Sequence, residues 1–424
     1  MSTIARPRAR NTALVLAAAA VLIGINPSAP ASARIPPRTG FEQRAGSSWT
    51  TEAEETSFLT TVRQRSSRVA VERIGTTRKG RPLRLVRVGE PRENVLLLIC
   101  SQHGDEPAGR EACLTTIRDL AFGEDPATRR LLARTTVLVV PTANPDGLAA
   151  GTRGNSENAD INRDHIVLRT AEARAIAAVL RDRQPDIVYD LHEFLGDEPY
   201  YTRDLLTLWP RHPGVDPAVR AASKSLARTD VRAAAERAGF TTGDYGIWID
   251  PRTGVPVRQV AGDGQERILR NTVGLKHALG VLAETRVNPA PPGPATNRRR
   301  VRAQLTALHG ALAFTTRNVT AVEAATTAAR AGDGGTGPLA VGGADNAPPR
   351  RGETITDLPC GYRLDPTEYA RASERLALHG IEVHPRKDGA FVPLRQPLRS
   401  LVPLLLDARA AHPLAAAVPL RRCP

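Results

Sequence analysis

Short apolar runs alternate with amphipathic patterns through the first two thirds of the chain. The runs are almost wholly apolar, as strands buried on both faces are, and the segments between them repeat apolar residues at helical spacing. The expected strands are residues 95–100, 137–140, 187–190 and 281–284, and the expected helices are residues 108–120, 170–180, 218–238 and 267–279. This alternation predicts an α/β fold with a mixed, largely parallel central sheet flanked by helices on both faces.

Breaks in this pattern predict where the chain divides. Residues 34–48 are polar and rich in Gly, Pro and Ser, which predicts a flexible leader. The strand and helix alternation fills residues 49–287, which we interpret as one domain. The Pro-rich residues 288–297 predict a linker, and residues 298–424 a smaller C-terminal α/β accessory region without a chemical motif of its own.

The N-terminus has the composition of a secretory signal. Three arginines precede the apolar residues 13–25, and Ala31-Ser32-Ala33 supplies the small residues at which a signal peptidase cuts. We therefore predict a Sec-type signal peptide over residues 1–33 and a secreted, extracellular protein. The apolar run is shorter than the roughly 18 residues of a membrane span, so no stable membrane insertion is expected after cleavage. An uncleaved N-terminal anchor stays an alternative.

The chain is basic, with a formal net charge of +14, and all but four of its 58 basic residues are arginines. These arginines are scattered, and their densest cluster is Arg298-Arg299-Arg300. Because no basic stripe is interleaved with aromatic residues, we expect no nucleic-acid partner and interpret the charge as a compositional bias. Association with an anionic cell wall stays open.

Four cysteines allow three disulfide connectivities, and an exported protein folds where disulfides persist. We favour a Cys360–Cys423 pair, because both residues lie in the C-terminal region. Cys100 and Cys113 lie on a predicted strand and the helix that follows it. A disulfide between them and two buried free thiols are equally open.

Side chains with metal-binding chemistry follow two of the predicted strands. His103 and Glu106 come just after strand 95–100, and His192 comes just after strand 187–190. The carboxyl ends of parallel strands gather at one edge of a sheet, so these groups can meet. Two histidines and a glutamate are a typical ligand set of catalytic zinc, with one coordination position left open. Each residue taken alone is more often structural or solvated.

Six separated motifs occur in an order that resembles the zinc carboxypeptidases of the funnelin type (peptidase family M14). They are HGDE at 103–106, NPDG at 144–147, Arg153, DINR at 160–163, DLHE at 190–193 and the late Glu284. The resemblance covers about residues 50–286 and does not reach the C-terminal region.

The resemblance implies one Zn2+ per chain, held by His103, Glu106 and His192. It implies that Glu284 acts as the general base, taking a proton from water and returning it to the leaving amine. It further implies that Arg153 contacts the substrate and stabilises the oxyanion of the tetrahedral intermediate.

The same resemblance implies a clamp for the C-terminal carboxylate of a peptide substrate, formed by Asn162 and Arg163. Asp160 matches the carboxylate that orients the first ligand histidine. Asp190 and Glu193 flank the second ligand histidine and could act similarly, with surface or helix-entry roles equally open.

Three positions depart from the family pattern. Asp164-His165 stands where the family has an aromatic or apolar residue, so the floor of the substrate site is expected to differ. Tyr245 is the nearest candidate for a tyrosine over the substrate, but a core or loop tyrosine is favoured. The segment that forms the family's side-chain pocket precedes Glu284 and contains three arginines, Arg258, Arg267 and Arg270. We favour solvated helix positions for them over a basic pocket that binds acidic side chains.

We therefore expect a secreted zinc metallocarboxypeptidase that hydrolyses the C-terminal peptide bond of peptides with a free terminal carboxylate. One alternative is a zinc amidase or deacylase that acts on cell-wall peptides or N-acyl amino acids. The other is a non-catalytic binding protein on the same fold, which a complete ligand set together with Glu284 disfavours.

Overall fold

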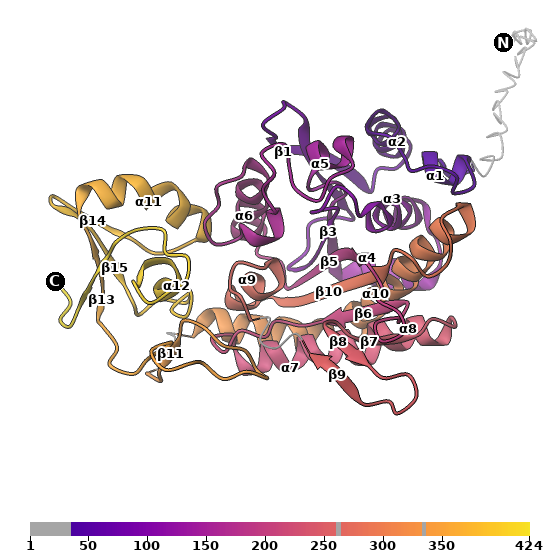
Figure 1. Ribbon diagram of the computed structural model, residues 1–424. Coiled ribbons are helices and arrows are strands. Elements are labelled where there is room, and N and C mark those ends of the chain that lie inside the picture. Colours follow the sequence, from indigo (N-terminus) through magenta and orange to yellow (C-terminus); the bar gives the residue numbers. More distant parts are fainter. Residues whose placement is uncertain (1–34, 260–263, 333–335) are drawn as a thin grey trace, which may run out of the picture. The chain divides into compact units, whose positions relative to one another are not determined.

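An eight-stranded mixed sheet forms the centre of the protein (Figure 1). The computed structural model describes residues 35–424 apart from 260–263 and 333–335, so the predicted signal peptide at 1–33 lies outside the described residues. The strand order is β1-β2-β4-β3-β5-β10-β6-β7. The central run β4-β3-β5-β10 is parallel, as is β6 with β7, and the other pairs are antiparallel. The predicted mixed, largely parallel sheet is confirmed.

The strands of this sheet are β1 (Val69–Thr76), β2 (Pro82–Val88), β3 (Asn94–Cys100), β4 (Thr135–Val140), β5 (Ile187–Phe194), β6 (Leu205–Leu208), β7 (Thr242–Asp244) and β10 (Leu279–Arg286). The helices around it include α2 (Glu52–Arg65), α3 (Pro107–Phe122), α4 (Pro126–Arg134), α5 (Pro145–Ala150), α6 (Ala171–Arg183), α7 (Pro217–Ser225), α8 (Arg232–Arg237), α9 (Leu269–Leu275) and α10 (Pro294–Ala331). A short 3-10 turn covers Ile161–Arg163, and a hairpin of β8 (Ile247–Ile249) and β9 (Pro256–Gln259) stands apart from the sheet.

Both faces of the central strands are buried, as their continuous apolar sequence predicts. Every residue of β3, β4, β5 and β10 is buried. Along β3, Leu96 and Leu98 belong to one core cluster, and Leu97 and Ile99 belong to another. The first core is shared with α3 and α10 and the second with α6 and α9, so helices cover both faces. This burial fixes the strand ends, which carry the candidate site.

Two predicted segments differ from the structure. The leader at 34–48 is predicted to be flexible, but it contains helix α1 (Gly40–Gln43). Thr39 and Glu42 cap that helix reciprocally, and the buried Phe41 stacks on Trp49 at 5.0 Å, which holds the segment in place. The helix predicted over 267–279 ends at Leu275, because β10 already begins at Leu279.

The chain beyond α10 contains both strands and helices, the α/β content that was predicted for the C-terminal region. Its four-stranded sheet has the order β14-β15-β13-β16, and α11 packs against β15 and against α6. Its elements are β11 (Leu339–Ala340), β12 (Thr354–Ile355), β13 (Gly361–Leu364), α11 (Pro366–His379), β14 (His384–Arg386), β15 (Gly389–Pro393), α12 (Val402–Leu406) and β16 (Val418–Leu420). The favoured Cys360–Cys423 disulfide is present and joins the start of β13 to the chain end.

Helix α10 follows the Pro-rich segment and packs on the central sheet. It contacts α3 and β10, and its buried residues include Ala307, Leu308 and Ala311. Residues 37–424 accordingly cluster as one compact unit, and the domain boundary at 288–297 stays a prediction. Among the described residues, no helix is both long enough and apolar enough to cross a membrane.

The contact between α11 and the main unit predicts a loss of stability in acid. His379 is 1% exposed, its Nε2 lies 2.8 Å from the carbonyl oxygen of Ile166, and burial beside Lys276 lowers its pKa to about 3. Below about pH 6.5, His379 is therefore protonated in the unfolded chain but stays neutral in the folded chain. Stability falls as the pH drops, by up to about 3 kcal/mol at pH 4 from this residue. Thermal unfolding of His379→Gln, which keeps a donor for Ile166, should show a smaller difference between pH 7 and pH 4.

The exposed His384 supplies the control for this experiment. Its side chain lies on β14 beside Glu382, and His384→Gln should keep the pH dependence of the unmodified protein. An unchanged pH dependence in His379→Gln would contradict the assignment.

Candidate metal centre

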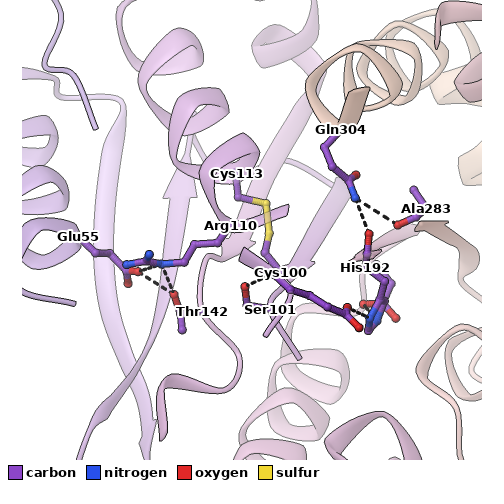
Figure 2. The surroundings of a disulfide bond; sticks show 11 residues. Glu55, Cys100, Ser101, Arg110, Cys113, Thr142, His192, Ala283 and Gln304 are labelled. Carbon is purple, nitrogen blue, oxygen red and sulfur yellow. Dashed lines mark hydrogen bonds and ion pairs between the residues drawn. A yellow bond between two sulfur atoms is a disulfide. The ribbon is translucent and has the colours of Figure 1, made fainter. Parts of the chain in front are cut away.

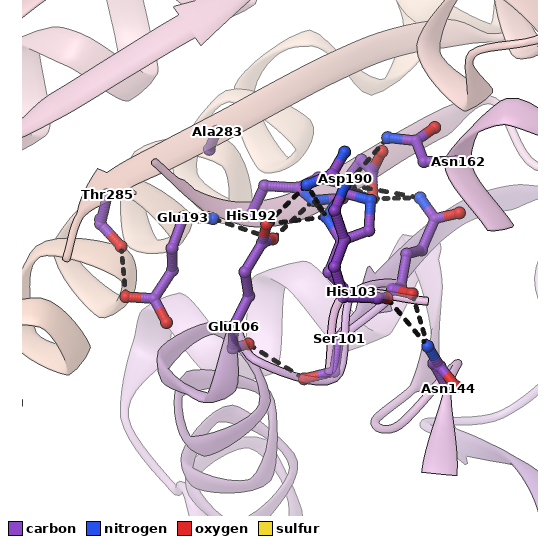
Figure 3. Close-up of polar contacts among 12 residues, drawn as sticks. Ser101, His103, Glu106, Asn144, Asn162, Asp190, His192, Glu193, Ala283 and Thr285 are labelled. Atoms are coloured by element: carbon purple, nitrogen blue, oxygen red, sulfur yellow. Dashed lines mark hydrogen bonds and ion pairs between the residues drawn. The ribbon is translucent and has the colours of Figure 1, made fainter. Parts of the chain in front are cut away.

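Three side chains from two neighbouring strand ends meet in the structure. His103 follows β3, Glu106 is the residue just before α3, and His192 lies near the end of β5. His103 Nδ1 lies 2.7 Å from Glu106 Oε1, and His192 Nδ1 lies 2.8 Å from Glu106 Oε2 (Figure 3). Their candidate ligand atoms lie within 4.8 Å of one another. The three residues predicted as metal ligands are therefore brought together.

The HGDE loop is held in place by the NPDG loop. Asn144 donates from Nδ2 to the carbonyl oxygen of Gln102 (Figure 3). Gly104 donates its N–H to the carbonyl oxygen of Thr152. A side chain at Gly104 would collide with the backbone of Gly147, so the two loops can pack this closely only with glycine there. The NPDG motif therefore supports the loop that carries His103 and Glu106.

Acidic side chains orient both histidines. His103 Nε2 lies 3.1 Å from Asp160 Oδ1, and His192 Nε2 lies 3.0 Å from Asp190 Oδ1. Burial alone would raise the pKa of Asp160, but the hydrogen bond to His103 and the charge of Arg153 hold it well below its usual range. The orienting role predicted for Asp160 agrees with this geometry, and Asp190 has the corresponding position at His192.

The charge of the cluster suits a divalent cation. Burial would raise the pKa of Glu106, but His192 and His103 lower it to about 2. Burial likewise opposes a charge on His192, but Asp190 and Glu106 raise its pKa well above the usual value, which shows that His192 has anionic surroundings. A divalent cation would take the place of the proton there. Two imidazoles and a carboxylate, buried and supported by further carboxylates, are the donor set and surroundings that zinc takes in proteins.

The first helix of the accessory region supports this centre, which the sequence analysis did not predict. Gln304 of α10 donates from Nε2 to the carbonyl oxygen of His192 at 2.7 Å (Figure 2). Arg300, one turn earlier, pairs with both carboxylate oxygens of Glu193 at 2.7 and 2.9 Å. Glu193 also accepts from the N–H of Ala108 at the start of α3. The sequence left an orienting role and a surface or helix-entry role open for Glu193. In the structure, its carboxylate links β5 to α3 and α10 through these hydrogen bonds.

The Cys100–Cys113 disulfide stands behind the same loop. It joins the last residue of β3 to α3 (Figure 2), and the loop between these two elements carries His103 and Glu106. The sequence left this pair open, and the structure contains it.

The candidate catalytic and substrate-binding residues line one cavity of about 430 Å3 beside the metal centre. The cavity is lined by His103, Glu106, Arg153, Asn162, Arg163 and Glu284, among others. Glu284 lies directly opposite His192 in the parallel register of β10 and β5. Burial, together with Glu106 and Asp190, raises the pKa of Glu284 well above its usual value, against the opposing effect of His192.

Arg153 and Asn162 are held on the metal side of this cavity. Arg153 pairs with Asp160 at 2.9 Å, and its Nη1 lies 3.2 Å from His103 Nδ1. Asn162 Nδ2 lies 3.1 Å from His192 Nε2, and Asn162 Oδ1 accepts the N–H of Leu269. Arg163 donates to the carbonyl oxygen of Asn162.

The departure at Asp164-His165 does not form the floor of the cavity. Asp164 accepts from the N–H and hydroxyl of Thr170, which caps α6. His165 is 2% exposed and its Nε2 lies 2.7 Å from Gln102 Oε1, and burial lowers its pKa to about 4. Both residues brace the loops behind the site.

Four aromatic side chains also line the cavity, and only Tyr245 among them was considered from the sequence. Tyr245 lines the cavity together with Phe194, Tyr201 and Trp248, and it also packs against the core, the position that the sequence favoured for it. Tyr201 stacks on Trp248 at 4.1 Å and lies 6.4 Å from Tyr245. Aromatic residues make up only 4% of the chain, so their recurrence between 194 and 248 was the available signal.

The three arginines that precede Glu284 have different surroundings. Arg258 is exposed over the ring of Trp248, and Arg267 is partly exposed beside Gln265. Arg270 is only 2% exposed and lines the cavity, which corrects the solvated position favoured for it.

Comparison with known proteins agrees with this arrangement. Residues 55–192 match the family model of the zinc carboxypeptidases. Carboxypeptidase 2 of Trichophyton tonsurans is 31% identical over 191 residues, which are 43% of this chain and 35% of the fungal protein. Carboxypeptidase E of Caenorhabditis elegans is 36% identical over 112 residues, which are 22% of this chain and 24% of that protein. The chain thus spans about a third of the length of the fungal relative.

The carboxypeptidase A structure from Helicoverpa armigera shares the fold. It superimposes with a TM-score of 0.50 at 14% identity, covering 64% of this chain and 75% of that chain. The family match ends at His192, so the placement of Glu284 rests on the pairing of β10 with β5.

Proposed function

We propose that the protein is a secreted, zinc-dependent carboxypeptidase that hydrolyses the C-terminal peptide bond of peptides, and the match of residues 55–192 to the zinc carboxypeptidase family model supports this. The register of β10 and β5 carries the proposal, because it sets Glu284 opposite His192 in the cavity that also contains His103, Glu106 and Arg153. A predicted signal peptide and two disulfides support export.

Zinc would be held by His103, Glu106 and His192, where it supplies a Lewis acid that polarises a carbonyl and makes water more acidic. Glu284 takes the proton of the attacking water and delivers it to the leaving amine. Burial suits it to this task, because a carboxylate with a raised pKa is a stronger base. The cavity holds both the proton acceptor and the candidate ligands.

Arg153 stabilises the oxyanion that forms at the scissile carbonyl. Burial would lower the pKa of its guanidinium, but Asp160 and Glu106 raise it, so the group keeps its charge in the cleft. A fixed cation acts most strongly where charge develops in the transition state.

Arg163, beside Asn162, binds the terminal carboxylate of the peptide. A guanidinium fork matches the planar carboxylate, which positions the last peptide bond beside the metal centre. This group makes the enzyme an exopeptidase.

Hydrolysis of matched peptides tests this proposal. The purified protein should contain one zinc per chain and should cleave a peptide with a free C-terminus at least about 10²-fold faster, in kcat/KM, than its C-terminal amide, because the amide leaves Arg163 without its anion. A dipicolinate-treated sample should lose activity and regain it with added zinc.

Other outcomes separate the competing functions. Equal cleavage of the free and amidated peptides would refute the carboxylate clamp and favour an amidase. Zinc binding without hydrolysis of any peptide in a diverse panel would favour a binding protein.

A further inference from the structure

The cavity continues from the metal centre past Glu284 toward α9. Leu282 and Glu284 both line it, and residues two apart on a strand share a face. A rise of about 3.3 Å per residue places Leu282 roughly 7 Å further along β10, about the length of one extended side chain. Arg270 and Gln265 line the cavity as well. The cleft therefore has room for a substrate side chain.

The backbone of Arg270 is fixed next to the proposed carboxylate clamp. Leu269, its neighbour at the start of α9, donates its N–H to Asn162 Oδ1 at 2.9 Å. On the other side, a Cβ at Gly280 would come within 2.8 Å of the carbonyl oxygen of Arg270, so α9 and β10 pack backbone to backbone there. These contacts hold Arg270 in register with Asn162 and β10.

The surroundings of Arg270 favour an anionic ligand group. Arg270 is 2% exposed, and the cavity that it lines is also lined by the apolar Leu282 and the aromatic Tyr245. Shielding from bulk water strengthens the attraction between a guanidinium and a carboxylate, and the guanidinium fork adds directional preference. Methylene groups of a substrate can pack on Leu282 while the carboxylate reaches Arg270.

We propose that the cleft selects peptides whose C-terminal residue is acidic, with Arg163 binding the terminal carboxylate and Arg270 binding the side-chain carboxylate. The proposal rests on the proposed carboxypeptidase function and names its substrate class. A C-terminal glutamate or aspartate presents two carboxylates, and these two arginines line the cavity around Asn162. The depth of the cleft favours glutamate over aspartate, and like charge disfavours C-terminal lysine and arginine.

A set of peptides that differ only in the last residue tests this specificity. We expect kcat/KM for a C-terminal glutamate to exceed that for the isosteric glutamine by about 30-fold and that for arginine by at least about 10²-fold. In Arg270→Met the ratio of kcat/KM for the glutamate peptide to that for the glutamine peptide should fall to about one.

Two matched variants make the result specific to Arg270. Arg267→Met removes a partly exposed arginine three residues away and should leave the preference unchanged. Arg163→Met should slow all the peptides by a similar factor, because they share the terminal carboxylate. An equal loss on all peptides in Arg270→Met would overturn the proposal, since it would assign Arg270 to the terminal carboxylate or to positioning Asn162.

Peptide binding gives a measurement independent of turnover. Calorimetry with the Glu284→Gln protein should show tighter binding of the glutamate peptide than of the glutamine peptide, and Arg270→Met should abolish the difference. Equal affinities would overturn the specificity while leaving the carboxypeptidase function intact. Absence of hydrolysis of any peptide by the unmodified protein would instead refute the proposed function.

Discussion

Replacing Glu284 with glutamine is expected to lower kcat/KM on a free C-terminal peptide by about 10³-fold, the scale of a lost general base. Glutamine keeps the size of the side chain but has no basic oxygen for the proton of water. The loss should not come from the metal, because the three candidate ligand residues are His103, Glu106 and His192. The variant should therefore bind one zinc per chain.

Steady-state kinetics with metal analysis on the same samples measures this effect. Glu198→Gln is a suitable control. Glu198 pairs with Arg286, which lies on β10 like Glu284, but Glu198 does not line the cavity. It should retain activity within about threefold. If Glu284→Gln were as active as the control, the base would have to be another residue.

The parts of the molecule that the sequence predicted are those with local signals. Buried parallel strands need continuous apolar runs, which placed β3, β4, β5 and β10 within a few residues. The candidate ligands and Glu284 lie at or just beyond the ends of these strands, so the predicted sheet gave their approximate meeting point. The role of Glu284 was predicted from the resemblance, and its place at the end of a strand is consistent with the sheet, although the family match ends before it.

The parts that were missed depend on contacts between residues far apart in the chain. Asp164 accepts from Thr170, the N-cap residue of α6, and His165 lies against Gln102 and does not line the cavity. Arg270 carries no local mark that separates it from the partly exposed Arg267, and only the packing of α9 against β10 buries it. The Pro-rich residues 288–297 predicted a linker, but their sequence does not indicate that the following helix, α10, packs on the central sheet.

The second large effect is expected from Arg300, which joins α10 to β5, the strand that carries His192. Arg300→Met should lower the free energy of unfolding by about 3–5 kcal/mol, because it strands the carboxylate of Glu193 in the interior. Burial raises the pKa of Glu193 even beside Arg300, and removing the arginine raises it further. The unfolded chain then loses this proton at a lower pH than the folded chain, so stability falls as the pH rises.

Thermal unfolding at pH 5 and pH 8 measures both parts of this prediction, and the deficit of Arg300→Met should be larger at pH 8. Adding Glu193→Gln to Arg300→Met removes the stranded charge and should recover part of the stability. Arg299→Met is the matched control: Arg299 pairs with Asp204 at the surface, where an ion pair contributes only about 0–1 kcal/mol. Equal stability of the Arg300 and Arg299 variants would contradict a structural role for the buried pair. A loss of stability in Arg300→Met alone would show that α10 stabilises the strand that carries His192, although α10 follows the Pro-rich segment. The same strand contacts another candidate ligand, because the N–H of Glu193 donates to Glu106 at 3.0 Å.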